Sequence, residues 1–249
     1  MKVSIIIPAR MASTRLPEKP LADILGKSLI MRAYDQAKKS KLTYETVVAT
    51  DHKKIFNHVD KHGGKVIMTS DKHISGTDRI AEVAKKLDSD IIINLQGDEP
   101  LIDPLQIDEL IQAMMSNDVL IGTQCSKLQN PDDLFDYNVV KVVRDFQNKA
   151  LYFSRQAIPA FRDLSYRLWL ENATYFRHVG MYGFKRDTLS EITKLQPSSY
   201  EKAESLEQLR WIENGYPIHC FETQYKSVGV DTAEDLEQVR DILLREMFH

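Results

Sequence analysis

The chain has 249 residues, 43% of them hydrophobic and 28% charged, and carries a formal net charge of −3 at pH 7. This composition is typical of a globular protein with a sizeable core, and the weak negative charge excludes a general electrostatic attraction to nucleic acid or anionic membranes. No apolar stretch approaches the roughly 18 residues of a membrane-spanning helix. The two cysteines, Cys125 and Cys220, lack a zinc-binding spacing. We therefore expect a cytoplasmic protein with reduced, partly buried cysteines and no nucleic-acid or membrane partner.

Short apolar runs alternate with helical patterns through the first half of the chain. Predicted helices follow Ser28 and Asp51, and two more begin at a cap at Thr77 and at Pro104. Strands that alternate with helices form a parallel sheet covered by helices, so this half predicts an α/β fold. The predicted strands span residues 3–7, 46–49, 65–68 and 91–95.

The second half contains a different arrangement of strands. Residues 139–143 and 150–153 are predicted to be antiparallel strands joined by a short polar turn. Residues 178–184 form a further predicted strand, which contains two glycines. Residues 162–174 have no clear period and predict a loop or a short helix.

Two further helices are predicted near the C-terminus. Ser198 and Glu201 resemble a capping box for a helix that extends to Leu209, and Thr232 begins the last helix. Because no linker or repeat divides the chain, we expect residues 1–249 to form one domain with an insertion-like sub-region.

A basic loop follows the first predicted strand. It contains Arg10, Arg15 and Lys19, with Ser13 and Thr14 between the two arginines. Guanidinium and ammonium groups bind phosphate oxygens, and loops at the carboxyl ends of strands carry ligands in open α/β sheets. Spacing alone leaves two interpretations, a triphosphate cradle and a basic surface loop. The loop contains neither GxGxxG nor GxxxxGKS/T, which argues against a common dinucleotide fold and a P-loop NTPase.

An acidic residue follows the apolar strand at residues 91–95. Asp98 lies beside Gly97, which allows a ligand to approach the backbone closely. A carboxylate at the ligand edge of a sheet suits Mg²⁺. The alternative role, a cap for the helix at Pro104, fits Asp103 better. We therefore favour the metal role for Asp98.

Asp231 is a second candidate metal ligand. It directly precedes the last predicted helix, and on the sequence alone a helix cap is the favoured role for it. The functional alternative is a second carboxylate that completes a Mg²⁺ site with Asp98.

Two other motifs have ordinary structural explanations. Residues 73–79 form a glycine-containing loop that enters a helix, where backbone N–H groups suit an anion or a nucleobase carbonyl. An ordinary cap at Thr77 explains the same residues, and the two interpretations are compatible. His58 and His62 have the spacing HxxxH, but with no third ligand apparent we expect a solvated helix face.

Seven motifs follow one another along almost the whole chain, from residue 3 to about residue 240. They lie at residues 8–21, 75–79, 96–100, 150–155, 178–184, 206–210 and 230–236. Each is modest by itself, but together and in this order they resemble the 3-deoxy-manno-octulosonate (Kdo) cytidylyltransferase family, the CMP-Kdo synthetases of lipopolysaccharide biosynthesis.

The resemblance implies a fold and a reaction. The fold is a Rossmann-like, mostly parallel sheet with helices on both faces and an antiparallel sub-region in the second half. The implied enzyme is an Mg²⁺-dependent nucleotidyltransferase, usually a homodimer, that makes CMP-Kdo and pyrophosphate from CTP and Kdo. Residues 1–125 would form the nucleotide-binding half and residues 126–249 the sugar-binding and dimerisation half. Residues 156–175 are the expected dimer contact.

The resemblance also assigns site residues by motif position. Metal binding falls to Asp98 and Asp231, and these two residues, with Arg15 and Lys19, are the expected catalytic residues. Residues expected to bind CTP are Ala9, Arg10, Ser13, Thr14, Arg15, Lys19, Ser75, Gly76, Arg79 and Gln96. Residues expected to line the sugar pocket are Gln96, Arg155, His178, Tyr182, Glu207 and Gln208.

The chain departs from the family pattern at two positions. Glu18 replaces the usual glycine, so that an acid beside the phosphate loop either weakens CTP binding or points to solvent. Phe184 replaces a common tyrosine and removes one hydroxyl. Two alternative functions remain open: a cytidylyltransferase for 8-amino-Kdo or sialic acid, and a CTP-binding protein without catalysis. The two carboxylates, Asp98 and Asp231, speak against a pure binding protein.

Overall fold

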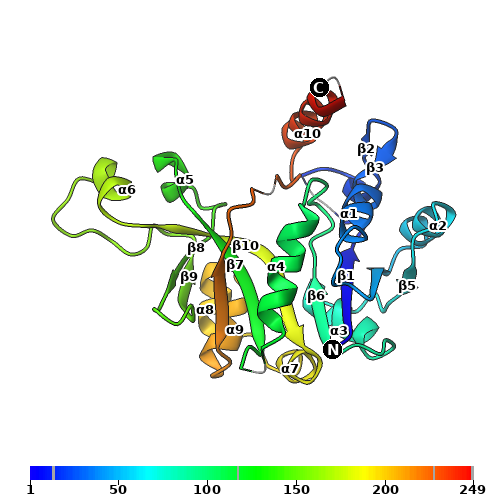
Figure 1. The fold of residues 1–249 in the computed structure, drawn as a ribbon, viewed down its shortest axis with the longest axis horizontal. Coiled ribbons are helices and arrows are strands. Elements are labelled where there is room, and N and C mark those ends of the chain that lie inside the picture. The colour runs from blue at the N-terminus through cyan, green and yellow to red at the C-terminus, as the bar shows by residue number, and fades with distance from the viewer. Residues whose placement is uncertain (13–14, 117, 227, 248–249) are drawn as a thin grey trace. The chain divides into compact units, whose positions relative to one another are not determined.

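The computed structural model describes residues 1–12, 15–116, 118–226 and 228–247 (Figure 1). It contains two compact units: unit 1 comprises Met1–Gln112 and Lys226–His249, and unit 2 comprises Ala113–Tyr225. The expected halves met at residue 125, whereas the chain passes into unit 2 earlier and returns to unit 1 near its end. Within the described ranges, no helix is both long and apolar enough to cross a membrane.

Unit 1 is built on a four-stranded parallel sheet in the order β6-β1-β4-β5. All four strands expected in the first half are confirmed. The elements of unit 1 are β1 (Val3–Ala9), the 3-10 helix η1 (Lys19–Leu21), β2 (Asp23–Ile24), β3 (Lys27–Ser28), α1 (Leu29–Ala37), β4 (Glu45–Thr50), α2 (Lys53–Lys61), β5 (Val66–Met68), α3 (Gly76–Ala84), β6 (Ile91–Asn94), α4 (Pro104–Met114), which begins in this unit, and α10 (Ala233–Met247).

The central strands β1 and β6 are buried on both faces. Ile5, Ile6 and Ile7 are fully buried, as are Ile91–Ile93 on the neighbouring strand. A parallel strand covered by helices on both sides requires apolar residues at successive positions, and this explains the uninterrupted runs in the sequence. The carboxyl ends of β1 and β6 therefore lie next to each other at one edge of the sheet.

The C-terminal helix α10 returns to the first part of unit 1. The side-chain hydroxyl of Thr232 accepts a hydrogen bond from the backbone N–H of Asp235, at 3.2 Å, which confirms Thr232 as its cap. Leu236 and Val239 of α10 pack with Ile24 in an apolar cluster. This packing holds the segment before α10 in place, and that segment contains Asp231.

Unit 2 contains a mixed sheet. In it β11 lies parallel to β7, β10 lies antiparallel to β7, and β8 pairs antiparallel with both β10 and β9. The elements are β7 (Ile121–Lys127), α5 (Pro131–Phe135), β8 (Lys141–Arg144), β9 (Ala150–Ser154), the 3-10 helix η2 (Tyr166–Leu168), α6 (Trp169–Asn172), β10 (Phe176–Lys185), α7 (Arg186–Ile192), α8 (Ser199–Glu204), α9 (Gln208–Glu213) and β11 (Ile218–Glu222). The prediction of an α/β chain, with a mostly parallel sheet and an antiparallel sub-region in its second half, is confirmed.

Several details of the prediction for unit 2 are wrong. The strands β7 and β11 were not predicted, because apolar and polar residues are mixed along them without a clear alternation. The helix expected from Ser198 to Leu209 is two helices, because Ser205 adopts a left-handed conformation with φ 53°. An ion pair between Arg210 and Glu201, 2.7 Å from Nε to Oε2, joins α9 to α8. Such a tertiary contact has no signature in local periodicity.

The two cysteines are free, and both are fully rather than partly buried. Cys125 lies on β7 and Cys220 on the adjacent strand β11, in the interior of unit 2. The prediction of partial burial was therefore wrong, because neither of the two strands had been recognised.

Candidate functional site

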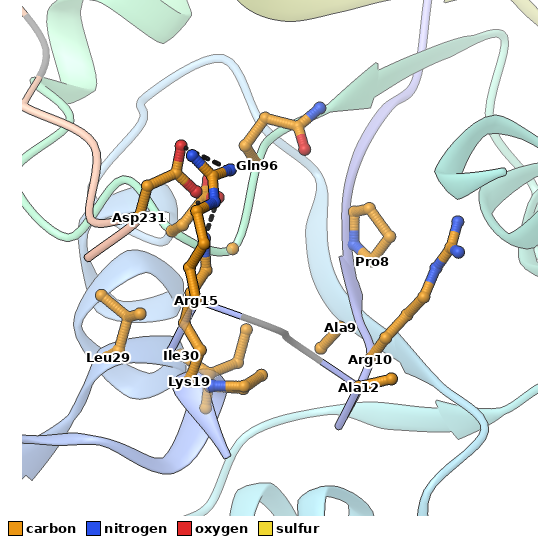
Figure 2. Close-up of a pocket in the computed structure, with 13 residues that line it drawn as sticks. Pro8, Ala9, Arg10, Ala12, Arg15, Lys19, Leu29, Ile30, Gln96 and Asp231 are labelled. Atoms are coloured by element: carbon orange, nitrogen blue, oxygen red, sulfur yellow. Dashed lines mark hydrogen bonds and ion pairs between the residues drawn. The ribbon is translucent and has the colours of Figure 1, made fainter. Parts of the chain in front are cut away.

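A cavity of about 380 Å³ lies in unit 1 at the carboxyl edge of the parallel sheet (Figure 2). Its lining includes six of the expected site residues: Arg10, Arg15, Lys19, Gln96, Asp98 and Asp231. They come from three segments that are far apart in the sequence, namely the loop after β1, the loop after β6 and the segment before α10. The structure thus brings together the two acidic motifs and the basic loop. Ala9, at the end of β1, is the seventh expected site residue that lines the cavity.

The loop after β6 is held close to β1. A side chain at Gly97 would place its Cβ 3.0 Å from Ile30 Cδ1 and 3.3 Å from the carbonyl oxygen of Pro8. Only glycine therefore fits between α1 and the end of β1 without displacing them. A hydrogen bond of 2.9 Å from the backbone N–H of Val230 to the carbonyl oxygen of Asp98 then joins the third segment to this loop.

Lys19 lies between the two carboxylates. Its Nζ atom is 2.6 Å from Oδ2 of Asp98 and 2.9 Å from Oδ1 of Asp231. Burial by itself would lower the pKa of Lys19, but the charges and hydrogen bonds of Asp98 and then Asp231 outweigh it and raise the pKa above its ordinary value. The ammonium group is therefore charged throughout the physiological pH range.

The two arginines of the basic loop have different environments. Arg15 forms an ion pair with Asp231, 3.2 Å from Nη2 to Oδ2. Figure 2 shows Arg10 on the other side of the cavity, well separated from Arg15 and Asp231. Ser13 and Thr14, which were expected to bind CTP, lie outside the described residues.

The carboxylate pair fits a small divalent cation. Asp98 and Asp231 direct one oxygen each towards a single cationic atom, and carboxylate oxygens are the ligands that Mg²⁺ prefers. Among the described residues no third acid, histidine or cysteine joins them. Water and phosphate oxygens would supply the remaining ligands, as is usual for Mg²⁺ in nucleotide enzymes.

Glu18 points away from this cavity. Its carboxylate forms an ion pair with Lys54 of α2, 2.8 Å from Oε1 to Nζ, and its backbone is left-handed with φ 52°. Glycine adopts this conformation without strain, and this gives a physical reason for the glycine usual in the family. The replacement of glycine by Glu18 therefore affects the backbone conformation of the loop, whereas the Glu18 carboxylate is directed away from the expected ligand.

The loop before α3 has a different cap from the predicted one. Ser75, not Thr77, caps α3 in a capping box with Asp78. Arg79 is buried and pairs with Asp51 at 2.7 Å, so its guanidinium lies away from the cavity surface. Its contact with CTP stays a prediction, as do those of Ser75 and Gly76; the observed contacts give Arg79 the role of holding the loop.

Six residues are expected to bind the sugar. Gln96 belongs to unit 1, and the other five belong to unit 2. Arg155 donates hydrogen bonds of 2.8 Å from Nε to the carbonyl oxygen of Glu204 and from Nη1 to that of Tyr137. These contacts fix the guanidinium at the end of β9 near the start of α9. Glu207 and Gln208 lie at that start, where Gln208 is buried.

His178 and Tyr182 lie together on β10, with their rings 5.3 Å apart between centroids. Burial, with a smaller effect of the Arg177 charge, lowers the pKa of His178 to about 3. Burial also raises the pKa of Tyr182 well above its ordinary value, with smaller effects of Cys220 and Glu207. Both side chains are therefore neutral. The buried hydroxyl of Tyr182 has no hydrogen-bond partner in the described part of the chain.

A bulge in β10 arranges these two side chains. The pairing of β10 with β7 shifts between Val179 and Tyr182. The hydroxyl oxygen of Thr123 lies 2.8 Å from the carbonyl oxygen of Met181 and 3.0 Å from Nε2 of His178. The hydroxyl of Thr123 has one proton, which it donates to a carbonyl oxygen of the bulge. The Thr123 oxygen therefore accepts a hydrogen bond from Nε2–H of His178, and the lone pair of the neutral ring is on Nδ1. Thr123 thus orients His178, an expected site residue, and it was not predicted because it lies on the unrecognised strand β7.

Phe184, the second departure from the family pattern, is fully buried. Its ring stacks on Tyr182 at 5.8 Å and meets Trp211 edge-on at 5.4 Å. The Phe184 ring therefore packs against Tyr182 in the core and is not exposed to a ligand.

The comparisons with known proteins identify the family of the chain. A family model described as cytidylyltransferase matches residues 4–243. A protein of Geotalea uraniireducens named 3-deoxy-manno-octulosonate cytidylyltransferase is 47% identical over 249 residues, covering 98% of this chain and 99% of that protein. The chain belongs to this family. A relative of the same name from Parabacteroides distasonis is 46% identical, over 96% of both chains.

Solved structures give the same result. The structure of a CMP:2-keto-3-deoxy-manno-octonic acid synthetase complexed with CTP superposes with a TM-score of 0.92, at 42% identity, and covers 99% of this chain and 100% of that chain. A 4-diphosphocytidyl-2C-methyl-D-erythritol synthase from Anaerococcus prevotii, at 13% identity and a TM-score of 0.63, shares the fold alone; it covers 98% of this chain and 99% of that chain. The chain is therefore a nucleotidyltransferase of the cytidylyltransferase family.

Proposed function

We propose that this protein transfers CMP from CTP to Kdo and releases pyrophosphate, as a step of lipopolysaccharide biosynthesis. The observation that carries the proposal is the single cavity in which Arg10, Arg15 and Lys19 meet Asp98 and Asp231. Three cations suit a triphosphate, and two carboxylates suit the metal that accompanies it. The names of the relatives support CTP and Kdo as the substrates.

The reaction needs positioning and charge neutralisation more than covalent chemistry. The anomeric hydroxyl oxygen of Kdo forms a bond to the α-phosphorus of CTP, the bond from that phosphorus to the pyrophosphate oxygen breaks, and the hydroxyl proton passes to solvent. Arg15 and Lys19 would stabilise the charge that moves onto the departing pyrophosphate. No protein nucleophile takes part, so we expect no covalent enzyme intermediate.

Asp98 and Asp231 would hold Mg²⁺. When bound, the ion supplies Lewis-acid activation of the phosphate and of the attacking hydroxyl. Gly97, which lines the cavity and packs closely against Ile30 and the end of β1, would hold this loop at the sheet edge where the nucleotide binds. Gln96, on the same loop, would contact the nucleotide and the sugar.

We further propose that the sugar-binding residues of unit 2 recognise Kdo through neutral groups and one cation. Arg155 would pair with the sugar carboxylate. The lone pair on Nδ1 of His178 and the hydroxyl of Tyr182 would bind sugar hydroxyls, with Glu207 and Gln208 beside them. The support is the unpartnered hydroxyl of Tyr182, since a buried polar group without a partner is costly unless a ligand satisfies it.

Pyrophosphate release tests this function. The purified protein is mixed with CTP, Mg²⁺ and one sugar at a time: Kdo, 8-amino-Kdo or sialic acid. We expect release with Kdo and little with sialic acid. Preferential release with 8-amino-Kdo would change the assigned acceptor, and tight CTP binding without release with any sugar would identify a CTP-binding protein instead.

Three further properties are part of the proposal. The family resemblance supports a homodimer, which light scattering tests, and we place its contacts at residues 156–175. It also supports a cytoplasmic location, in agreement with the two free cysteines. The Mg²⁺ requirement is tested by removing divalent ions with a chelator, which should abolish pyrophosphate release and leave the fold intact.

A further inference from the structure

Lys19 lies where a metal ion bound by both carboxylates would lie. Its Nζ atom is within 2.9 Å of an oxygen of Asp98 and of an oxygen of Asp231. The Lys19 side chain is 15% exposed, compared with 31% for Asp98 and 50% for Asp231, so it is the least exposed of the three groups. The ammonium group fills the space between the carboxylates.

The ligand-free site is balanced in charge. Arg15 binds the second oxygen of Asp231, so that two cations face two carboxylates. A divalent ion that entered between the carboxylates would meet the ammonium at close range, where two like charges repel strongly. The ion can bind both acids only after Lys19 moves away.

The movement is confined to the side chain. The backbone of η1 is fixed by hydrogen bonds from Lys19 N–H to Leu16 O, at 3.2 Å, and from Leu21 N–H to Glu18 O, at 2.8 Å. Pro20 follows Lys19 directly and is buried. The flexible stem of a lysine allows its ammonium to exchange partners while the loop stays in place. In the cavity, the triphosphate of CTP is the anion that would receive it.

We propose that Lys19 is an internal counter-ion that occupies the metal position of the ligand-free protein and leaves it when a triphosphate binds. Mg²⁺ and the nucleotide then bind cooperatively, because the phosphates take the ammonium and release the two carboxylates to the ion. The part that concerns the nucleotide rests on the proposed function. The part that concerns the metal rests on the three side chains alone.

Metal binding without nucleotide tests the inference. The probe is Mn²⁺, whose free concentration is measured by electron paramagnetic resonance during titration of the full chain. We expect Lys19→Met to bind Mn²⁺ about tenfold or more tightly than the unaltered protein, within the usual range of coupling between sites. Arg10→Met is the matched control, since Arg10 lines the same cavity and forms no ion pair with these carboxylates within the described residues; it should change the affinity by less than about threefold.

A double variant locates the effect. Lys19→Met with Asp98→Asn should lose the gain in Mn²⁺ affinity, because only one carboxylate remains. Equal affinities of Lys19→Met and the unaltered protein would overturn the inference, and so would an equal gain in Arg10→Met. Circular dichroism and the melting temperature show whether each variant is folded.

The unaltered protein provides an independent measurement. Brief acetylation followed by mass spectrometry should label Lys19 slowly without metal and faster at saturating Mn²⁺, while Lys54, paired with Glu18 outside the cavity, serves as internal reference. An unchanged ratio of the two labels would contradict the inference even if Lys19→Met does not fold. Neither measurement uses a sugar, so pyrophosphate release can fail while the counter-ion role holds, or the reverse.

Discussion

The cavity of unit 1 and the residues around His178 in unit 2 use opposite physical means. In the cavity, charged groups neutralise one another before any ligand arrives, as Lys19 does with Asp98 and Asp231. Around His178 and Tyr182, burial keeps the side chains neutral, and the Tyr182 hydroxyl has no hydrogen-bond partner in the ranges that the structure describes. A site for a triphosphate can exchange ion pairs for ligand contacts, whereas a site for sugar hydroxyls requires neutral donors and acceptors that are fixed in advance.

The largest expected effect is on the charged site. Asp98→Asn keeps the size of the side chain and removes the charge, so kcat for pyrophosphate release should fall by about 100- to 1,000-fold. Asp103→Asn is the matched control, because Asp103 caps α4 through the backbone N–H of Leu105 at 2.8 Å. Steady-state kinetics with saturating Mg²⁺ provide the measurement. Near-normal turnover of Asp98→Asn would exclude the metal role.

The pH dependence of the unfolding free energy tests whether His178 is neutral in the folded protein. Burial lowers the pKa of His178 in the folded protein from 6.5 to about 3. Below pH 6.5 His178 takes up a proton in the unfolded chain but not in the folded protein. The free energy of unfolding is therefore unaffected by this histidine above pH 6.5, and it decreases as the pH falls from 6.5 towards 3. His178→Gln should therefore show a smaller loss of unfolding free energy over this range in urea titrations. Parallel curves for the two proteins would contradict a buried neutral histidine.

A smaller effect is expected at Tyr182. Tyr182→Phe removes a buried hydroxyl that has no hydrogen-bond partner among the described residues, so the free energy of unfolding should stay equal or rise by about 1 kcal/mol. Activity should fall although stability does not: the same change should lower kcat/KM for the sugar by about two- to tenfold and leave KM for CTP unchanged. Destabilisation, or a loss confined to CTP, would show that the hydroxyl has another role.

The smallest effect is expected at Glu18. Glu18→Gly should raise the melting temperature by a few degrees, because glycine adopts φ 52° without strain. Glu18→Ala is the control: it also removes the ion pair with Lys54 but keeps a side chain on a left-handed backbone, so it should give no gain. A similar rise in both variants would assign the effect to the charge, and KM for CTP then shows whether that charge reaches the phosphates.

The sequence alone predicted the fold class and the members of the charged site. The strands β1 and β6 are uninterrupted apolar runs, and β4 and β5 also have clear patterns, so the four strands of the parallel sheet in unit 1 could be recognised, whereas the two-residue strands β2 and β3 were not predicted. The strands β7 and β11 have mixed patterns and were missed, and with β7 the role of Thr123 was missed. The capping box at Ser198 was found because it is local. The break at Ser205, where the backbone is left-handed, was not predicted, and neither was the contact between Glu201 and Arg210 across it.

What the sequence determined by itself is which charged residues follow which strand: local patterns place Arg10, Arg15 and Lys19 after one strand and Asp98 after another. What only the tertiary structure decided is how they meet. Asp231 reaches Asp98 because α10 packs on the start of the chain and Val230 binds the backbone of Asp98. Lys19 lies between the two acids for the same reason. Contacts between segments more than 200 residues apart depend on the packing of the whole unit, and no local pattern encodes them.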